Sequence, residues 1–272
     1  RSSQAILSFE EPWFLEHRLA LGFELFRTQS DYYSAYYDEL RSGAEVYLRR
    51  RLFELVEGRL FYRFEDVNID EIQPLAPFWI KKQAGNTNVS KMGLTLTRDT
   101  RDSLIFPTDG SRTQVSQEFA GGPFGGNSDY GKFELRGAKF LKTSDTLEQV
   151  FSFMGRVGTI SEFDGGNVPF FEQFFLGGPY TLRGFDYSDV GPVDDGASSS
   201  NKTREPQGGH SYGFVSLEYT FRVAEPLRLA VFYDGGFVNK DDFDFNPSQG
   251  ADPYQSPGYF DNWGLGVRIM VM

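Results

Sequence analysis

The sequence predicts an all-β protein, a transmembrane antiparallel β-barrel of which this chain forms a part. Apolar and polar residues alternate with a period of two over segments long enough to cross a bilayer as tilted strands. Short and long connections also alternate along the chain, which is typical of outer-membrane barrels. Aromatic residues make up 17% of the 272 residues, and a content this high argues against disorder.

The alternation defines eleven expected strands. Most are close to the ~9–11 residues of a membrane-crossing strand, whereas ordinary globular strands have about 5–6. No long stretch has apolar spacing near 3.6, so we expect no substantial helix. The expected strands are 4–10, 15–28, 43–51, 58–66, 90–98, 111–119, 131–141, 149–160, 211–221, 227–238 and 260–271.

Each expected strand has one apolar face and one polar face. The polar face carries charge and glycine, which suits a wet barrel interior better than a packed sandwich core. The lipid-facing set in the last strands is expected to be Val215, Leu217, Phe221, Trp263, Leu265, Val267 and Ile269. The lumen-facing set is expected to be Glu218, Asp234, Asn262 and Arg268.

Composition excludes several classes of function. The 27 basic and 38 acidic side chains give a net charge of −11, and without a long basic block this argues against nucleic acid as a partner. No cysteine is present, which excludes disulfides and thiol chemistry. Neither His17, expected on the apolar face of strand 15–28, nor His210 has an evident catalytic partner. We therefore expect no enzyme, no metal and no cofactor.

The turn between strands 90–98 and 111–119 is long for its class and rich in charge. Pro107 cannot donate to a strand ladder, and Asp109-Gly110 favours a turn into the next strand. Alternating arginines and aspartates can cross-link the turn by salt bridges, each weak where exposed. The candidate residues are Arg98, Asp99, Arg101, Asp102, Pro107 and Gly110.

The connection 161–210 is the longest, and loops of this length are functional or disordered. Its 170–185 stretch is aromatic and glycine-rich. Left in water it would form an exposed apolar patch, so we expect it to pack in the barrel lumen. The 194–209 stretch is polar and is expected to be solvated and mobile.

Arg183 lies within that apolar stretch, and a buried guanidinium needs anionic partners. Glu218 and Asp234 fall in the middle of the following strands, on the polar face. A guanidinium forked between two carboxylates gives directional, bidentate pairing. On composition alone, unrelated surface charges remain the alternative interpretation.

At these residues the sequence resembles the BamA-type insertases of the bacterial surface-antigen superfamily. Thr97 to Ser111 resembles the family's periplasmic turn motif, and the strands with Glu218 and Asp234 resemble the pair whose acids meet the loop arginine. The stretch 170–185 ends in Thr-Leu-Arg-Gly-Phe, similar to the family's loop-tip motif, with leucine in place of a β-branched residue. The motif residues are Arg183, Gly184 and Phe185.

The resemblance implies a protein of the bacterial outer membrane that folds and inserts unfolded β-barrel substrates. It implies contact with outer-membrane lipid, and accessory assembly lipoproteins and periplasmic POTRA repeats that this chain lacks. A polypeptide translocator of the same superfamily and a passive porin-like barrel are the alternatives.

The family barrel has sixteen strands, and the eleven expected here resemble its fourth to fourteenth. Residues 1–272 would thus form a partial barrel with the 161–210 loop folded into it. An odd number of strands does not close a usual single-chain barrel. We therefore expect an open sheet with two free edges, and no insertase activity from this chain alone.

Overall fold

The computed structural model describes residues 2–30, 36–74, 76–144, 148–163, 165–193, 206–224, 227–247 and 258–269. All eleven expected strands are present, and they form one antiparallel sheet in chain order. The strands are β1 (Ser2–Glu11), β2 (Ala20–Ser30), β3 (Asp38–Phe53), β4 (Val56–Asp70), β5 (Gly85–Asp99), β6 (Gly110–Ala120), β7 (Tyr130–Ser144), β8 (Gln149–Glu162), β9 (Ser211–Ala224), β10 (Leu227–Asn239) and β11 (Phe260–Ile269).

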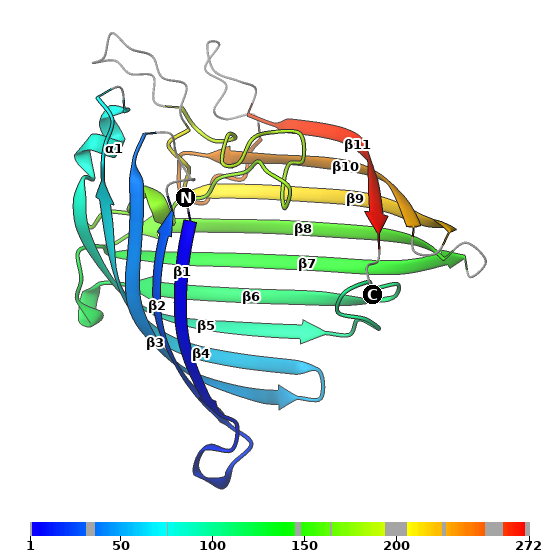
Figure 1. Ribbon diagram of the computed structural model, residues 1–272, viewed down its shortest axis with the longest axis horizontal. Coiled ribbons are helices and arrows are strands. Elements are labelled where there is room, and N and C mark those ends of the chain that lie inside the picture. The colour runs from blue at the N-terminus through cyan, green and yellow to red at the C-terminus, as the bar shows by residue number, and fades with distance from the viewer. Residues whose placement is uncertain are drawn as a thin grey trace.

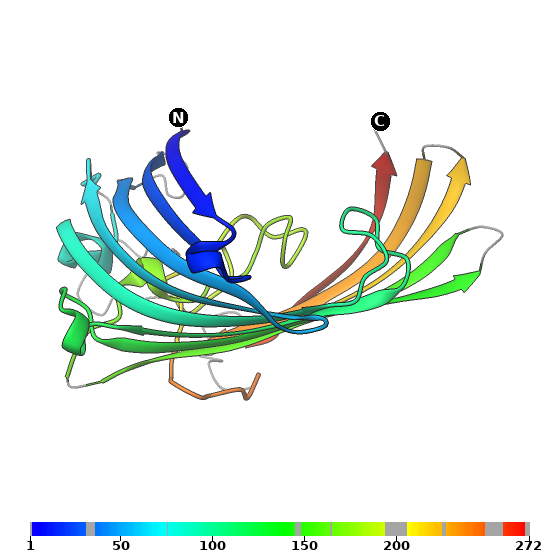
Figure 2. The ribbon, with the colours of Figure 1, turned by 90° about the horizontal axis from the view of Figure 1, so that it is seen from below.

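The sheet curves into an open trough, with β1 and β11 at its two rims (Figures 1 and 2). Within the described residues, β1 pairs with β2 alone and β11 with β10 alone. The expected open sheet is therefore confirmed. The longest connections, 71–84, 163–210 and 240–259, all lie at the same end of the strands.

The convex face of the trough is apolar and exposed. Trp263, Leu265, Val267 and Ile269 on β11 are 62–78% exposed. Val215, Leu217 and Phe221 alternate along β9 with the buried Ser216, Glu218 and Thr220. The predicted register is thus confirmed in these strands. A face of this kind matches the lipid-facing band of an outer-membrane barrel.

The second strand starts later than expected. Phe14 N–H donates to Leu19 C=O across the turn, and a 3₁₀ turn, η1 (Phe14–Glu16), lies between them. Leu15 and Glu16 have positive φ angles of 54° and 60°, which no strand allows. The prediction of a strand from residue 15, with His17 on its apolar face, is therefore wrong. The alternation of apolar and polar residues continues by chance into the turn, and for this reason it indicated a strand that starts too early.

One short helix, α1 (Phe78–Lys82), interrupts the connection 71–84 and was not expected. Its Trp79 and Ile80 are buried against the end of β4 and against Phe170 of the long loop. Five residues are too few to show an apolar period of 3.6, which explains why the sequence pattern missed the helix. No helix in the described part of the chain is long and apolar enough to span a membrane.

Two expectations lie outside the described residues. They are the end of the last strand beyond Ile269 and most of the polar stretch 194–209, from 194 to 205.

The convex face allows a test of the register in the middle of the sheet. Leu217 lies on that face of β9, beside Phe153 of β8 and Tyr233 of β10. An arginine facing lipid near the bilayer midplane costs about 2–4 kcal/mol. Leu217→Arg should therefore lower the free energy of unfolding in liposomes well below that of the Leu217→Ala control. Equal losses in the two variants would show that Leu217 does not face lipid.

Candidate functional site: a loop anchored on the concave face

The connection between β8 and β9 folds back over the concave face of the sheet (Figures 1 and 2). Backbone bridges join its outgoing and returning halves at Phe174 and Gly209, and at Leu176 and Val190. The two halves of the loop are therefore paired with each other. We call residues near 170–176 and 206–210 the base of the loop and residues 183–185 its tip.

Apolar side chains of this loop make the main core of the protein. Phe174, Leu176 and Leu182 are buried together with side chains of the sheet. The ring centroids of Phe174 and Tyr212 lie 4.5 Å apart. Full burial of a large apolar side chain contributes about 1.5–3 kcal/mol. The loop residues of this cluster are Val168, Phe174, Leu176, Leu182 and Val190, and its sheet residues are Val89, Ala120, Tyr130, Ile160, Tyr212, Phe214 and Val238. The expectation that the aromatic stretch packs against the barrel wall is therefore confirmed.

At the tip, Arg183 forks between both predicted acids. Its Nε donates to Asp234 Oδ2 at 2.7 Å and its Nη2 to Asp234 Oδ1 at 2.7 Å. Its Nη1 donates to Glu218 Oε2 at 2.6 Å. Its Nη2 also donates to Ser216 Oγ at 3.1 Å. We call Arg183, Ser216, Glu218 and Asp234 the tip site. The predicted contact is confirmed, and its charge-assisted bidentate geometry is the strong kind.

Two neighbouring strands place these acceptors side by side. Asp234 of β10 pairs in register with Ser216 of β9, and Glu218 follows on the same face. Asp234 is fully buried and Glu218 is 2% exposed. Burial lowers the pKa of Arg183, but its hydrogen bonds to Asp234 and Glu218 outweigh burial and raise the pKa above its ordinary value. Arg183 therefore stays charged at any physiological pH.

The residues after Arg183 close the tip against β11. Gly184 has a φ of +101°, which favours glycine, and a Cβ there would come within 2.7 Å of the Asn262 amide nitrogen. The ring of Phe185 meets Phe260 edge-on at 5.7 Å. All three predicted motif residues thus contact the concave face, Arg183 through β9 and β10, and Gly184 and Phe185 through β11.

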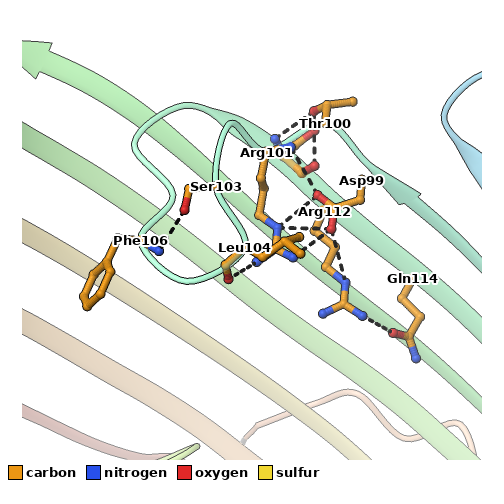
Figure 3. Close-up of polar contacts among 9 residues, drawn as sticks. Asp99, Thr100, Arg101, Ser103, Leu104, Phe106, Arg112 and Gln114 are labelled. Carbon is orange, nitrogen blue, oxygen red and sulfur yellow. Dashed lines mark hydrogen bonds and ion pairs between the residues drawn. The ribbon is translucent and has the colours of Figure 1, made fainter. Parts of the chain in front are cut away.

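One predicted pair of charges, Arg101 with Asp99, lies at the start of the turn 100–109 (Figure 3). Among the described contacts, the arms of the turn are joined by hydrogen bonds to Asp102 rather than by a second ion pair within it. Arg101 Nε donates to Asp99 Oδ1 at 2.9 Å, and its Nη2 donates to Asp99 Oδ2 at 2.7 Å. Asp102 accepts from Thr108 N–H at 2.8 Å and Asp109 N–H at 3.1 Å. The side-chain hydrogen bond from Thr108 is the main cause that lowers the pKa of Asp102 to about 2.

The other predicted turn residues play different parts. Gly110 has a φ of +100°, and a Cβ there would lie 2.2 Å from the Thr100 carbonyl oxygen. Arg98 is exposed at the end of β5, and Pro107 is half-buried beside Thr108. Within the described contacts, neither Arg98 nor Pro107 belongs to the hydrogen-bonded pairs of the turn. No group of three or more His, Asp or Glu among the described residues is placed to hold a metal ion.

Several contacts of the site were not predicted from the sequence, although Arg268 was expected on the inward face. Phe232 places its ring 3.6 Å from Arg183 Cζ, and Arg268 of β11 forms a second ion pair with Glu218. Arg268 shares the inward face of β11 with Asn262, so the alternation held a signal for this pair. Glu172 at the loop base forms buried ion pairs with Lys91 and Lys132. A lone carboxylate within the run Phe-Phe-Glu-Gln-Phe-Phe was the available signal for that cluster.

Comparisons with known proteins agree with this architecture. The profile of the Omp85 superfamily domain matches residues 1–271. An outer membrane protein assembly factor BamA of Nitratidesulfovibrio vulgaris is 31% identical over 187 residues, covering 68% of this chain and 23% of that protein. A SAM50-like protein of Schizosaccharomyces pombe is 29% identical over 163 residues, covering 58% of this chain and 33% of that protein.

Among solved structures, BamA from Haemophilus ducreyi lacking POTRA domains 1–3 aligns with a TM-score of 0.78 at 18% identity. The alignment covers 98% of this chain and 56% of that one. CdiB from Acinetobacter baumannii aligns with a TM-score of 0.59 at 16% identity, over 99% of this chain and 44% of that one. The chain therefore spans less than two thirds of the length of these relatives.

The fold and the anchored loop define the class: an antiparallel sheet of the β-barrel type that holds a long loop on its concave face. With the match over residues 1–271, the chain belongs to the Omp85 superfamily.

The tip site predicts a large effect of removing its cation. Arg183→Ala leaves Asp234 buried without its partner, and loss of one member of a buried pair typically costs about 3–5 kcal/mol. We expect easier heat unfolding of the barrel and faster proteolysis within 163–210. The stability of Arg183→Lys, which keeps the charge but not the bidentate geometry, should lie between those of wild type and Arg183→Ala. Wild-type stability of Arg183→Ala would show that the ion pairs do not hold the loop.

The turn predicts a defined pH dependence. The pKa of Asp102 is lowered on folding, so its contribution is fully present above the ordinary aspartate pKa of about 4 and is lost as pH falls through about 2. At pH 7, Asp102→Asn should speed amide hydrogen exchange at Thr108 and Asp109. Below pH 2 the variant and wild type should exchange alike, and a difference that persists there would exclude the ionised carboxylate as the cause.

Proposed function

We propose that this chain forms part of the barrel of an outer-membrane protein assembly factor, which folds and inserts β-barrel substrates into the membrane. The tip site carries the proposal. Three charge-assisted bonds from Arg183 fix a long loop against the inner face of an Omp85 sheet. The names of the sequence relatives, BamA and SAM50-like, support the same assignment.

The physical task of such a protein is to protect the edge of an unfinished sheet. Unpaired backbone N–H and C=O groups cost several kcal/mol each in hydrocarbon, so a nascent strand needs a pairing edge until its own barrel closes. A sheet that offers such an edge must keep its curvature while one seam is open. The anchored loop braces the wall from inside, because it contacts strands from β5 to β11.

The proposal includes the partners that this activity needs. Unfolded outer-membrane proteins are the substrates, and the exposed apolar convex face contacts outer-membrane lipid. Accessory assembly lipoproteins and periplasmic POTRA repeats complete the machine, which we assign to a bacterial outer membrane. No bound nucleotide, metal or catalytic side chain is required, since strand pairing itself releases the free energy.

A depletion strain tests the assignment. The gene's full product, wild type or with Arg183→Ala, replaces the native copy, and the readout is the amount of heat-resistant folded barrel proteins in the outer membrane. We expect wild type to restore these proteins and Arg183→Ala to restore markedly fewer at equal expression. Normal levels of barrel proteins after depletion, together with failed export of one polypeptide, would overturn the assignment and indicate a translocator.

A further inference from the structure

The base of the loop has its own buried ion pairs, far along the sheet from the tip. Glu172 lies in a 3₁₀ turn, η3 (Phe170–Glu172), and is 4% exposed. Lys91 Nζ of β5 lies 2.9 Å from Glu172 Oε1. Lys132 Nζ of β7 lies 3.3 Å from Glu172 Oε2 and donates to the Glu172 backbone oxygen at 2.7 Å. We call Glu172, Lys91 and Lys132 the base site.

The sheet provides a buried ammonium group with which the carboxylate of the loop can pair. Lys91 is 7% exposed, and its ammonium has two further acids at longer range, Glu65 at 3.4 Å and Glu118 at 3.5 Å. An ammonium has three donors, and the short contact belongs to the acid from the loop. Burial raises the pKa of Glu172, but the charges of Lys91 and Lys132 outweigh burial and hold the pKa well below its usual range.

Aromatic packing sets the direction in which Glu172 points. The ring of Phe170 meets Trp79 of α1 at 5.0 Å, and its backbone N–H donates to Gln83 Oε1 at 3.0 Å. The ring of Phe171 lies 5.0 Å from Arg41 of β3. The turn is therefore held on the side of β3 to β7, whereas the tip site belongs to β9 and β10.

We propose that Glu172 is a second positioning residue, which fixes the base of the loop independently of Arg183. The two sites have opposite polarity, because the loop brings an anion to lysines at its base and a cation to carboxylates at its tip. A loop turned end for end would bring Arg183 to Lys91 and Lys132, and would bring Glu172 to the carboxylates of Glu218 and Asp234. The pair of sites thus sets a single orientation of the loop across the sheet. Only the effect on assembly rests on the proposed function; the effect on loop position does not.

Amide hydrogen exchange on the gene's full product in liposomes tests the proposal. Glu172→Gln should speed exchange at the base amides of Phe170 and Gln173 by roughly tenfold or more, since a buried charged partner is lost. The tip amides of Arg183 and Phe185 should keep their wild-type rates. Arg183→Lys should produce the reverse pattern.

Glu118→Gln is the matched control, because it removes from the same lysine a carboxylate that belongs to the sheet and not to the loop. It should leave the base amides unchanged, and Glu172→Asp should restore part of the protection that Glu172→Gln loses. Equal loosening in Glu118→Gln, or equal loosening of base and tip in Glu172→Gln, would overturn the proposal. If wild type fails to restore barrel assembly in the depletion strain, the proposed function fails while the exchange pattern still decides the role of Glu172.

Discussion

The inner face of a single curved sheet has no second sheet to cover it, and the rest of this structure follows from that constraint. Strands β5 to β10 send apolar side chains such as Val89, Tyr130 and Ile160 to the concave side, where they are fully buried. The cover comes from the chain itself, because the loop between β8 and β9 folds back over them. A segment that would be an exposed apolar patch in water is therefore the core of the protein.

Apolar packing alone would allow such a cover to slide, since hydrophobic contact is not directional. Direction comes from the ion pairs, whose hydrogen bonds require a defined geometry. Buried charges are costly unless they are paired, so each ion pair both orients the loop and requires its presence. The glycine at the tip adds a conformational condition, because Gly184 has a positive φ that favours glycine and lies against the Asn262 amide.

Much of the fold could be predicted from the sequence, because a period of two is a direct consequence of strand geometry. The fork of Arg183 could be predicted from the same parity, which put Glu218 and Asp234 on one face. The pattern failed where local hydrogen bonding overrode it, as in the turn at Leu15, and where the element was as short as α1.

The partners of Glu172 could not be predicted from the sequence for a different reason. Lys91 and Lys132 stand 81 and 40 residues away along the chain, and only the curvature of the sheet brings them together. Strand register assigns a residue to a face but does not state how far a loop extends over that face. Sequence reasoning therefore found the contact beside the loop's own following strands and missed the one with earlier strands.

Glu218 and Asp234 of the tip site differ in their cationic partners, and this difference affects the order in which the two positions can change in evolution. Glu218 also pairs with Arg268, whereas the hydrogen bonds that Asp234 accepts within the described residues all come from Arg183. A lineage that drifts to another residue at 218 leaves Arg183 with its bidentate partner. A lineage that loses Arg183 first leaves a fully buried carboxylate without its cation. One that loses Asp234 first leaves the Arg183 guanidinium without its bidentate partner. Arg183 and Asp234 should therefore be inherited or replaced as a pair, while position 218 is free to vary earlier.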